Sequence, residues 1–317
     1  LEKKNGSLIY LLPNQTDSTE YYALRWTGGR MFGSYKISRH VNLKLVSSGK
    51  LKLYAEGSMS SFEGARLVGG KLLIFLSDSK DGKKIFYMQE YSKEIEPIGE
   101  AKRLASFDIV KRGGKGWFDI QMSENHKFLG ILWQIPGRNE RNERYGFKIY
   151  NTDLELINEG DYPLPFEPEL SRIHAHHISN SGDYFLALTE YQKNPNTQVF
   201  KNNFEFKALH IFHIATDGLQ DFVLQANDKR VVAMAMTSND ENIFTITGVY
   251  GEKGQTGVTG VLFEQVDLNT GKVLRSGIKE FDKEFITQGW TNREKNRANR
   301  REQKGKGEPQ LYNYQMR

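Results

Sequence analysis

The sequence predicts an all-β fold, a β-propeller of about six four-stranded blades. Its main support is a repeat in which a polar turn, an apolar run, a polar hairpin and a second strand recur. The repeats begin near Gly69, Ser123, Ser181 and Ser238, at spacings of 54, 58 and 57 residues. One small sheet cannot bury its own faces, so such repeats are expected to stack as blades. The 30 glycines and 8 prolines fit a chain with many turns and few rigid linkers.

The clearest unit runs from Phe118 to Gly160. Residues 118–122 alternate between apolar and polar, as a half-buried strand does, and a polar turn follows. Residues 128–133 form an apolar run, and further strands are expected at 147–150 and 154–157. Three or four strands in series make one blade.

The other units have the same order of strands and turns. After the clearest unit, strands are expected at 184–188, 208–214 and 222–224, and then at 234–236, 243–249, 261–263 and 272–274. Before it, a compact unit is expected at 72–76, 85–91 and 95–98, and a looser first unit at 21–26, 31–32, 41–45 and 51–54. The sequence therefore contains five recognisable blade-like units.

A sixth blade is expected from the two ends of the chain. Residues 7–13 and 278–288 would pair in it, because closing a ring removes exposed sheet edges. The alternative is a fragment of a longer ring, since residues 312–317 read as the entry to another strand. We therefore expect a propeller over 1–290, and a basic tail or the start of a further blade over 291–317.

One repeat resembles a known superfamily. The turn Ser179-Asn180-Ser181-Gly182-Asp183, followed by the apolar run 184–188, resembles the repeat of TolB/WD40-like propellers. Taken with the turn Asn151-Thr152-Asp153 of the preceding unit, the chain is similar to uncharacterised exported propeller proteins of the Bacteroidota over residues 66–278. The resemblance implies a cell-envelope location and a binding role, and it brings no catalytic residues. The first residue is Leu1 rather than Met, so a segment is expected to have been removed before it, either a cleaved export signal or a stretch trimmed for another reason.

The bulk composition excludes several classes of function. The formal charge of +5 lies entirely within residues 293–306, which hold seven basic and two acidic side chains. This basic segment lacks the interleaved aromatic residues that stack on bases, so no nucleic-acid partner is expected. The chain has no cysteine, which excludes disulfides, thiolate metal sites and thiol catalysis. No apolar run is long enough for a transmembrane segment.

Basic and aromatic residues in loops are the candidates for binding a protein partner. Trp26 and Trp117 each stand beside a basic, glycine-rich stretch, and Trp and Arg are favoured at interaction hot spots. The alternative is a single anchoring Trp tucked under each blade. The candidates are Arg25, Trp26, Arg30, Arg112, Lys115, Trp117, Arg293, Arg297, Arg300 and Arg301. Further contacts are expected from the loops 111–117, 136–145, 191–203 and 251–260.

Histidines offer only a weak candidate metal site. On a strand, His174 and His176 would point to the same face, close enough to share an ion. His126, Asp183 and Glu190 from neighbouring loops are possible third ligands, but the sequence identifies none of them as one. No metal and no cofactor is therefore expected.

Catalytic motifs are scarce in the sequence. Residues 57–61 miss the G-x-S-x-G pattern, and Gly251-Glu252-Lys253-Gly254 lacks the ending of a P-loop. We therefore expect a non-enzymatic adaptor, gripping a protein partner in a periplasmic or outer-membrane assembly and reaching the membrane through that partner or the basic tail. The alternative is a hydrolase or lyase that acts on a polysaccharide or peptide at the propeller mouth. An enzyme should show a pocket with converging carboxylates or histidines of perturbed pKa.

Overall fold

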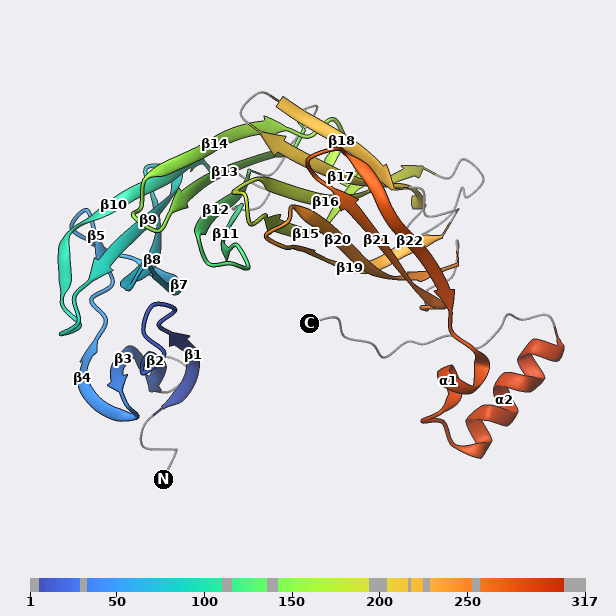
Figure 1. Cartoon of the computed structure of the whole chain (residues 1–317), viewed down its shortest axis with the longest axis horizontal. Coiled ribbons are helices and arrows are strands. Elements are labelled where there is room, and N and C mark those ends of the chain that lie inside the picture. Colours follow the sequence, from blue (N-terminus) through green and yellow to red (C-terminus); the bar gives the residue numbers. More distant parts are fainter. Residues whose placement is uncertain are drawn as a thin grey trace. The chain divides into compact units, whose positions relative to one another are not determined.

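The computed structural model describes most of the chain (Figure 1). The described residues are 6–28, 33–109, 116–135, 142–193, 204–215, 218–224, 229–252 and 257–304. The chain divides into two compact units, one formed by residues 1–122 and 126–164 and the other by 123–125 and 165–317.

The first unit holds three four-stranded antiparallel sheets and one short two-stranded sheet. The first four-stranded sheet contains β1 (Ser7–Pro13), β2 (Glu20–Gly28), β3 (Gly33–Val41) and β4 (Lys44–Lys50). The second contains β7 (Ser61–Val68), β8 (Lys71–Lys80), β9 (Lys83–Tyr91) and β10 (Pro97–Asp108). The third contains β11 (Trp117–Met122), β12 (Phe128–Ile135), β13 (Arg144–Asn151) and β14 (Leu156–Pro163), and the short sheet pairs β5 (Tyr54–Ala55) with β6 (Ser58–Met59).

The second unit holds two more four-stranded antiparallel sheets. One contains β15 (Ser171–Ile178), β16 (Tyr184–Lys193), β17 (Phe204–Ala215) and β18 (Gly218–Leu224). The other contains β19 (Arg230–Ser238), β20 (Ile243–Gly251), β21 (Gly260–Asp267) and β22 (Lys272–Glu280). In all five sheets the strands pair in chain order, as they do in propeller blades.

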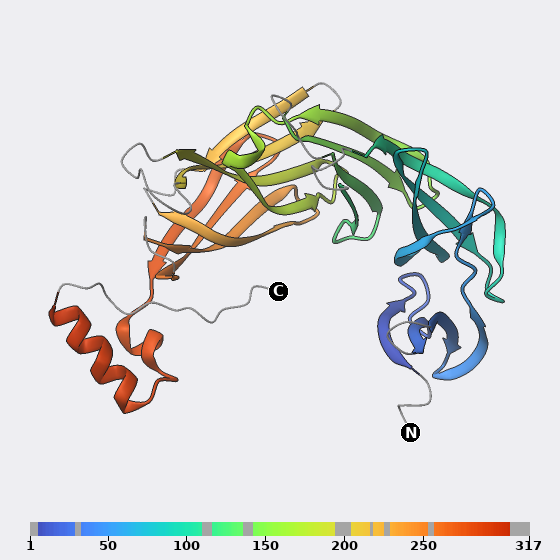
Figure 2. The ribbon, with the colours of Figure 1, turned by 180° about the vertical axis from the view of Figure 1, so that it is seen from behind.

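Helices are few and short. A 3₁₀ turn at Pro168–Leu170 precedes β15, and α1 (Lys283–Thr287) and α2 (Asn292–Gln303) follow β22, as Figure 2 shows in orange and red. Asp282 caps α1 by accepting a hydrogen bond from the Phe285 amide, and Thr291 and Glu294 form a capping box at α2. Among the described residues, no helix is long and apolar enough to cross a membrane.

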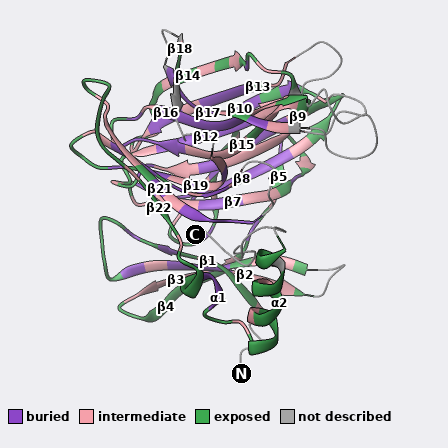
Figure 3. Cartoon of the chain, turned by 90° about the vertical axis from the view of Figure 1, so that its right-hand side faces the viewer, coloured by how far each residue is buried: buried purple, intermediate pink, exposed green. Residues whose placement is uncertain are grey.

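Burial follows the position of each strand within its sheet (Figure 3). The central strands β8, β12 and β16 carry long buried runs, whereas the outer strands β4, β14 and β22 are mostly exposed. In the first unit, two apolar clusters fill the spaces between neighbouring sheets. In the second unit, one cluster joins β16 and β17 to β19, β20 and β21. Stacking of sheets therefore buries the apolar faces that a single blade leaves open.

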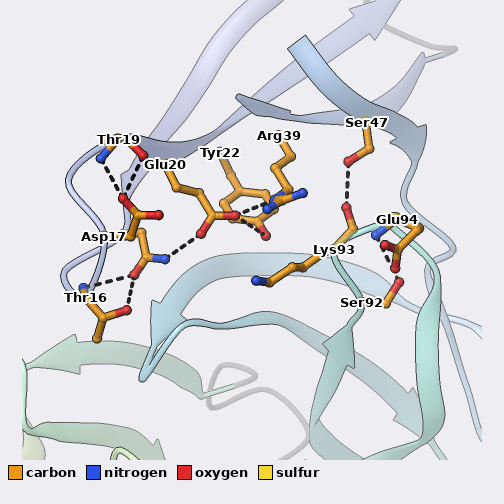
Figure 4. A network of polar contacts seen from close by, with 11 residues as sticks. Thr16, Asp17, Thr19, Glu20, Tyr22, Arg39, Ser47, Ser92, Lys93 and Glu94 are labelled. Atoms are coloured by element: carbon orange, nitrogen blue, oxygen red, sulfur yellow. Dashed lines mark hydrogen bonds and ion pairs between the residues drawn. The ribbon is translucent and has the colours of Figure 1, made fainter. Parts of the chain in front are cut away.

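A polar network supports the first sheet (Figure 4). The Glu20 carboxylate is buried and pairs with Arg39, and the Asn14 side-chain amide donates to it at 2.6 Å. Burial alone would raise the pKa of Glu20, but the hydrogen bonds from Arg39 and Asn14 outweigh it and lower the pKa. Glu20 therefore stays ionised inside the sheet.

The propeller-type, all-β fold class is confirmed by these four-stranded sheets. The closing blade expected from the two ends is not formed. Residues 7–13 pair with β2 inside the first sheet, residues 278–280 end β22 on β21, and residues 283–287 are helical. The sequence of β1 already has a partner seven residues downstream, and such a local hairpin costs less loop-closure entropy than pairing the chain ends.

Candidate catalytic cavity

A cavity of about 510 Å³ lies in the second unit, lined by strands of both its sheets. Its size falls within the range of small-molecule sites. Ser181, Asp183, Phe185, Ile211, His213, Gln220, Asn242, Phe244, Ile246, Glu264, Val266, Leu268, Asn269, Thr270 and Gly271 line it. Among these lining residues, three titratable side chains are described: Asp183, His213 and Glu264.

Local structure brings Asp183 and His213 together. Asp183 closes the turn that begins at Ser179, whose amide donates to the Asp183 carbonyl at 2.9 Å. β16 starts at the next residue, and Phe185 on β16 pairs directly with His213 on β17. The two rings stack at 4.8 Å, which holds the imidazole on the cavity side of the sheet. The repeat turn and the strand register thus place both side chains.

Asp183 is held as a carboxylate. Its Oδ1 lies 3.4 Å from His213 Nε2, and its Oδ2 accepts hydrogen bonds from the Ser181 hydroxyl at 2.5 Å and the Ser179 hydroxyl at 3.3 Å. The interaction with His213 contributes most, and together these contacts lower the pKa of Asp183 despite its partial burial. The carboxylate can therefore orient His213 and stabilise a positive charge on the imidazole.

Glu264 has the opposite electrostatic environment. It lies on β21 directly opposite Ile246, and Phe244 and Val266 line the same cavity. Desolvation by these neighbours raises the pKa of Glu264. A carboxyl group with a raised pKa keeps its proton to a higher pH and can donate it.

The rest of the cavity combines an apolar floor with a polar rim. Phe185 and Phe244 are buried and stack at 4.5 Å. At the rim, the Asn242 side-chain amide donates to Asn269 Oδ1 at 3.0 Å, and Gln220 and Thr270 also line the cavity. Side-chain amides and hydroxyls of this kind match the hydroxyl groups of a sugar.

The hydroxyls beside Asp183 do not form a serine-hydrolase triad. In a triad, the imidazole stands between the hydroxyl and the carboxylate and takes the hydroxyl proton. Here Asp183 stands in the middle, so Ser181 donates to the carboxylate. Ser181 therefore orients Asp183 and is not activated as a nucleophile.

The structure places the predicted partner-binding residues at separate positions. Trp26 is half-buried on β2 and packs edge-on against Tyr35, and Arg25 precedes it. Trp117 is half-buried at the start of β11 and packs edge-on against Tyr145. Arg293, Arg297 and Arg300 are exposed on α2. Arg30, Arg112, Lys115 and the side chain of Arg301 lie outside the described residues, as do most of the predicted contact loops.

The candidate metal histidines bind other side chains. A β-bulge falls at His174, whose Nε2 bonds Thr189 Oγ1 at 2.6 Å, while His176 Nδ1 bonds the Tyr184 hydroxyl at 2.6 Å. The bulge breaks the simple alternation on which a shared face depends. Within the described parts of the chain, no group of three or more His, Asp or Glu side chains could hold a metal ion.

Sequence reasoning found only part of this cavity. Asp183 is one of the possible third metal ligands in the sequence, whereas His213 is not among the candidate residues; His210 and His213 lie on opposite faces of β17. That opposition is what allows His210 to bond Asp221 while His213 faces Asp183. The sequence contains one signal that could have indicated Glu264. This charged residue interrupts an apolar strand, and it points to the face opposite that of exposed Phe263.

Comparisons with known proteins concern the fold. No protein-family model matches the chain, and no curated protein matches its sequence. Prolyl oligopeptidase B from Galerina marginata is similar in structure at 12% identity and a TM-score of 0.44, over 86% of this chain and 34% of that chain. An alpha-L-arabinanase from Penicillium chrysogenum is similar at 10% identity and a TM-score of 0.42, over 86% of this chain and 93% of that chain. An endo-arabinase from Bacteroides thetaiotaomicron has 10% identity and a TM-score of 0.35, over the same shares. The chain thus spans about a third of the first of these proteins, and no residue roles transfer at such low similarity.

The prediction of a non-enzymatic adaptor is wrong. Of the two predictions, the alternative of a hydrolase has the better support. The cavity also has the feature stated above as the mark of an enzyme, namely converging titratable groups with perturbed pKa values. The sequence did not indicate this cavity because its three titratable groups come from the turn before β16, from β17 and from β21, which are far apart along the chain.

Proposed function

We propose that this protein is a hydrolase that cleaves glycosidic bonds of a polysaccharide, with the cavity of the second unit as its active site. One observation carries the proposal: the cavity holds a carboxyl group with a raised pKa together with an anionic carboxylate–histidine pair. Hydrolysis of an acetal requires one group that gives a proton and one that takes a proton, and the environments of the two groups must shift their pKa values in opposite directions.

Each group has a distinct role in the proposed reaction. Glu264 donates its proton to the oxygen of the leaving sugar as the glycosidic bond breaks. His213 takes a proton from the attacking water, and Asp183 stabilises the resulting imidazolium across 3.4 Å. Gln220, Asn242 and Asn269 at the rim bind sugar hydroxyl groups. Among the described lining residues there is no Lys or Arg to neutralise a uronate carboxylate, which favours hydrolysis over elimination.

The test is the release of reducing sugar from neutral polysaccharides such as arabinan, galactan and xylan. Substitution Glu264→Gln removes the proton donor, and His213→Gln removes the base, so each should lower kcat by about 10²–10⁴-fold. Glu284→Gln, at an exposed position of α1, is the matched control and should retain full activity. A folded protein that cleaves none of these polymers, or a Glu264→Gln variant as active as the control, would overturn the proposal.

The pH dependence of activity tests the role of Glu264 separately. Glu264 donates only while protonated, so activity is present below its pKa in the folded protein and lost above it. Because burial raises this pKa above the ordinary 4.5, the alkaline limb should lie above pH 4.5. Asp183 has a lowered pKa and stays ionised, so it adds no acidic limb above pH 3.8. With an activated aryl glycoside, which needs no proton donor, Glu264→Gln should regain activity and lose the alkaline limb.

A further inference from the structure

A second cavity, of about 420 Å³, lies within the first unit. It is lined by Leu12, Pro13, Gln15, Arg66, Leu67, Ile120, Gln121, Met122 and His126. These residues come from the C-terminal ends of β1, β7 and β11 and from the turns that follow β1 and β11. The walls are largely apolar, and Arg66 and His126 are the titratable residues on them.

The guanidinium of Arg66 is fixed in place without a counter-charge. Its Nη1 donates to the Ala65 carbonyl at 2.9 Å and its Nη2 to the Ile120 carbonyl at 2.6 Å, and its centre lies 5.9 Å from the Tyr10 ring. These contacts use two of the five N–H donors of a guanidinium. Among the described residues, no carboxylate lies within ion-pair distance of Arg66, although the side chain is half-buried.

The neighbouring acid does not neutralise Arg66. Asp119 is not on the cavity wall; its carboxylate accepts hydrogen bonds from the Ile120 amide at 2.8 Å and the Gln121 side chain at 2.9 Å. A half-buried cation beside apolar walls of Leu12 and Ile120 gains strongly from an incoming anion, because the local dielectric constant is low. Arginine in a fixed orientation is suited to a planar carboxylate.

We infer that this cavity binds a sugar ring that carries a carboxylate, such as a uronate, with Arg66 holding the carboxylate. Gln15, the side-chain oxygen of Gln121 and His126 offer partners for ring hydroxyls, while Leu67 and Met122 contact the apolar face of the ring. The site is carried by Arg66 and by the cavity of the first unit. It does not depend on catalysis by Glu264 or His213.

The experiment is calorimetric titration of the full chain with D-glucuronate, D-glucose and inorganic phosphate. Glucuronate should bind, and glucose and phosphate should bind at least tenfold more weakly. Arg66→Met should weaken glucuronate binding at least tenfold. Arg66→Lys keeps the charge but loses the planar guanidinium, so its affinity for glucuronate should lie between that of the parent protein and that of Arg66→Met. Arg103→Met is the matched control, since Arg103 is an arginine of the same unit that is paired with Glu56.

A variant that leaves Arg66 intact guards against misfolding as the cause. Leu67→Trp fills the cavity and should abolish glucuronate binding while thermal unfolding stays close to that of the parent protein. Equal binding of glucose and glucuronate, binding of phosphate alone, or equal affinity of the Arg66→Met and Arg103→Met variants would overturn the inference. Polysaccharide cleavage is measured separately, so loss of this site and loss of the proposed activity are distinguishable.

Discussion

Single residues with left-handed backbone determine several of the tight hairpins. The two-residue loops Glu56-Gly57, Gly69-Gly70 and Asp81-Gly82 all have positive φ at both positions, which is the type I′ turn that antiparallel pairs favour. The loop between β3 and β4 has the same geometry, but its residues are Asn42 (φ 49°) and Leu43 (φ 64°). A leucine in this region is unfavourable because its Cβ crowds the backbone.

Leu43→Gly should stabilise the protein by about 1 kcal/mol. It creates the Asn-Gly sequence that type I′ turns prefer, and Leu43 is 84% exposed, so little packing is lost. Urea unfolding monitored by fluorescence gives the measurement. Leu43→Ala, which removes the same side chain but keeps a Cβ, is the control and should bring no comparable gain. A lower stability for the Gly variant than for the Ala variant would contradict the argument.

A half-buried histidine, His174, and a buried one, His177, couple stability to pH. Burial lowers the pKa of His174 to about 4, with a smaller contribution from Arg172, and burial also lowers the pKa of His177 to about 4. His177 Nε2 bonds the Ser238 hydroxyl at 2.9 Å, which links β15 to β19. Both imidazoles are therefore neutral in the folded protein near pH 7 and must gain a proton in acid.

The free energy of unfolding should fall as the pH falls from 6.5 to 4. The unfolded histidines bind protons near pH 6.5 and the folded ones only near pH 4. Their contribution to the free energy of unfolding is therefore complete above pH 6.5 and is lost progressively as the pH falls towards 4. The loss is roughly 2–3 kcal/mol per histidine by pH 4.5. Urea unfolding at pH 7.0 and 4.5 measures it. His177→Gln should remove about half of the pH dependence, whereas an unchanged pH dependence in the double variant with His174→Gln would count against this origin.

At the scale of elements, glycine–aromatic pairs across neighbouring strands recur in the sheets. Gly146 on β13 is the direct partner of Trp133 on β12, and a Cβ at position 146 would lie 2.0 Å from the indole. Gly277 on β22 stands opposite Phe263 on β21 in the same way. In each pair the ring covers the strand where a side chain is missing, which offsets the weak strand propensity of glycine.

Gly146→Ala should destabilise the protein by about 2–3 kcal/mol, because the added methyl group displaces the buried Trp133 ring. A blue or red shift of Trp fluorescence should accompany the loss in urea unfolding. Gly248→Ala on β20 is the matched control: its Cβ would meet neighbours at 3.3 Å or more and should cost less than about 1 kcal/mol. If Gly146→Ala and Gly248→Ala lost equal free energy of unfolding, the loss would come from replacing any strand glycine and not from displacement of the Trp133 ring.

Strand positions followed from the sequence to different degrees. The apolar runs at 128–133 and 184–188 lie inside β12 and β16, which are buried on both faces because each is a central strand. The expected strand at 51–54 is instead mostly irregular, and β14 runs further than expected, through polar residues to Pro163. Outer strands have one solvated face and are selected by pairing with a neighbour, so their composition indicates them only weakly.

At the scale of the whole molecule, the basic C-terminal segment is a helix with few links to the sheets. Among the described residues, one ion pair links α2 to the preceding elements; it joins Glu302 to Lys283, and both side chains are partly exposed. α1 is different, because Ile286 and Thr287 are buried. The stability of the second unit should therefore depend on α1 and not on α2.

Removal of residues 291–317 should change the melting temperature by no more than about 2 °C, since an exposed ion pair contributes at most about 1 kcal/mol. Removal of residues 282–317 also deletes buried Ile286 and should lower the melting temperature clearly. Differential scanning calorimetry of the two truncated chains makes the comparison. A large loss from the shorter deletion would mean that the helix contributes contacts beyond this ion pair.

The sequence by itself determined the class of this protein: the period of its turns and the alternation along its strands predict four-stranded antiparallel blades, because these patterns act over a few residues. It also located the net charge in one terminal segment. Only the tertiary structure decided which titratable groups line one cavity, since Asp183, His213 and Glu264 come from one turn and two strands of two sheets, and Arg66 is held by a carbonyl 54 residues away. The physical reason is that hydrogen bonding and desolvation act through space, so the groups that form a site become neighbours only when the sheets stack.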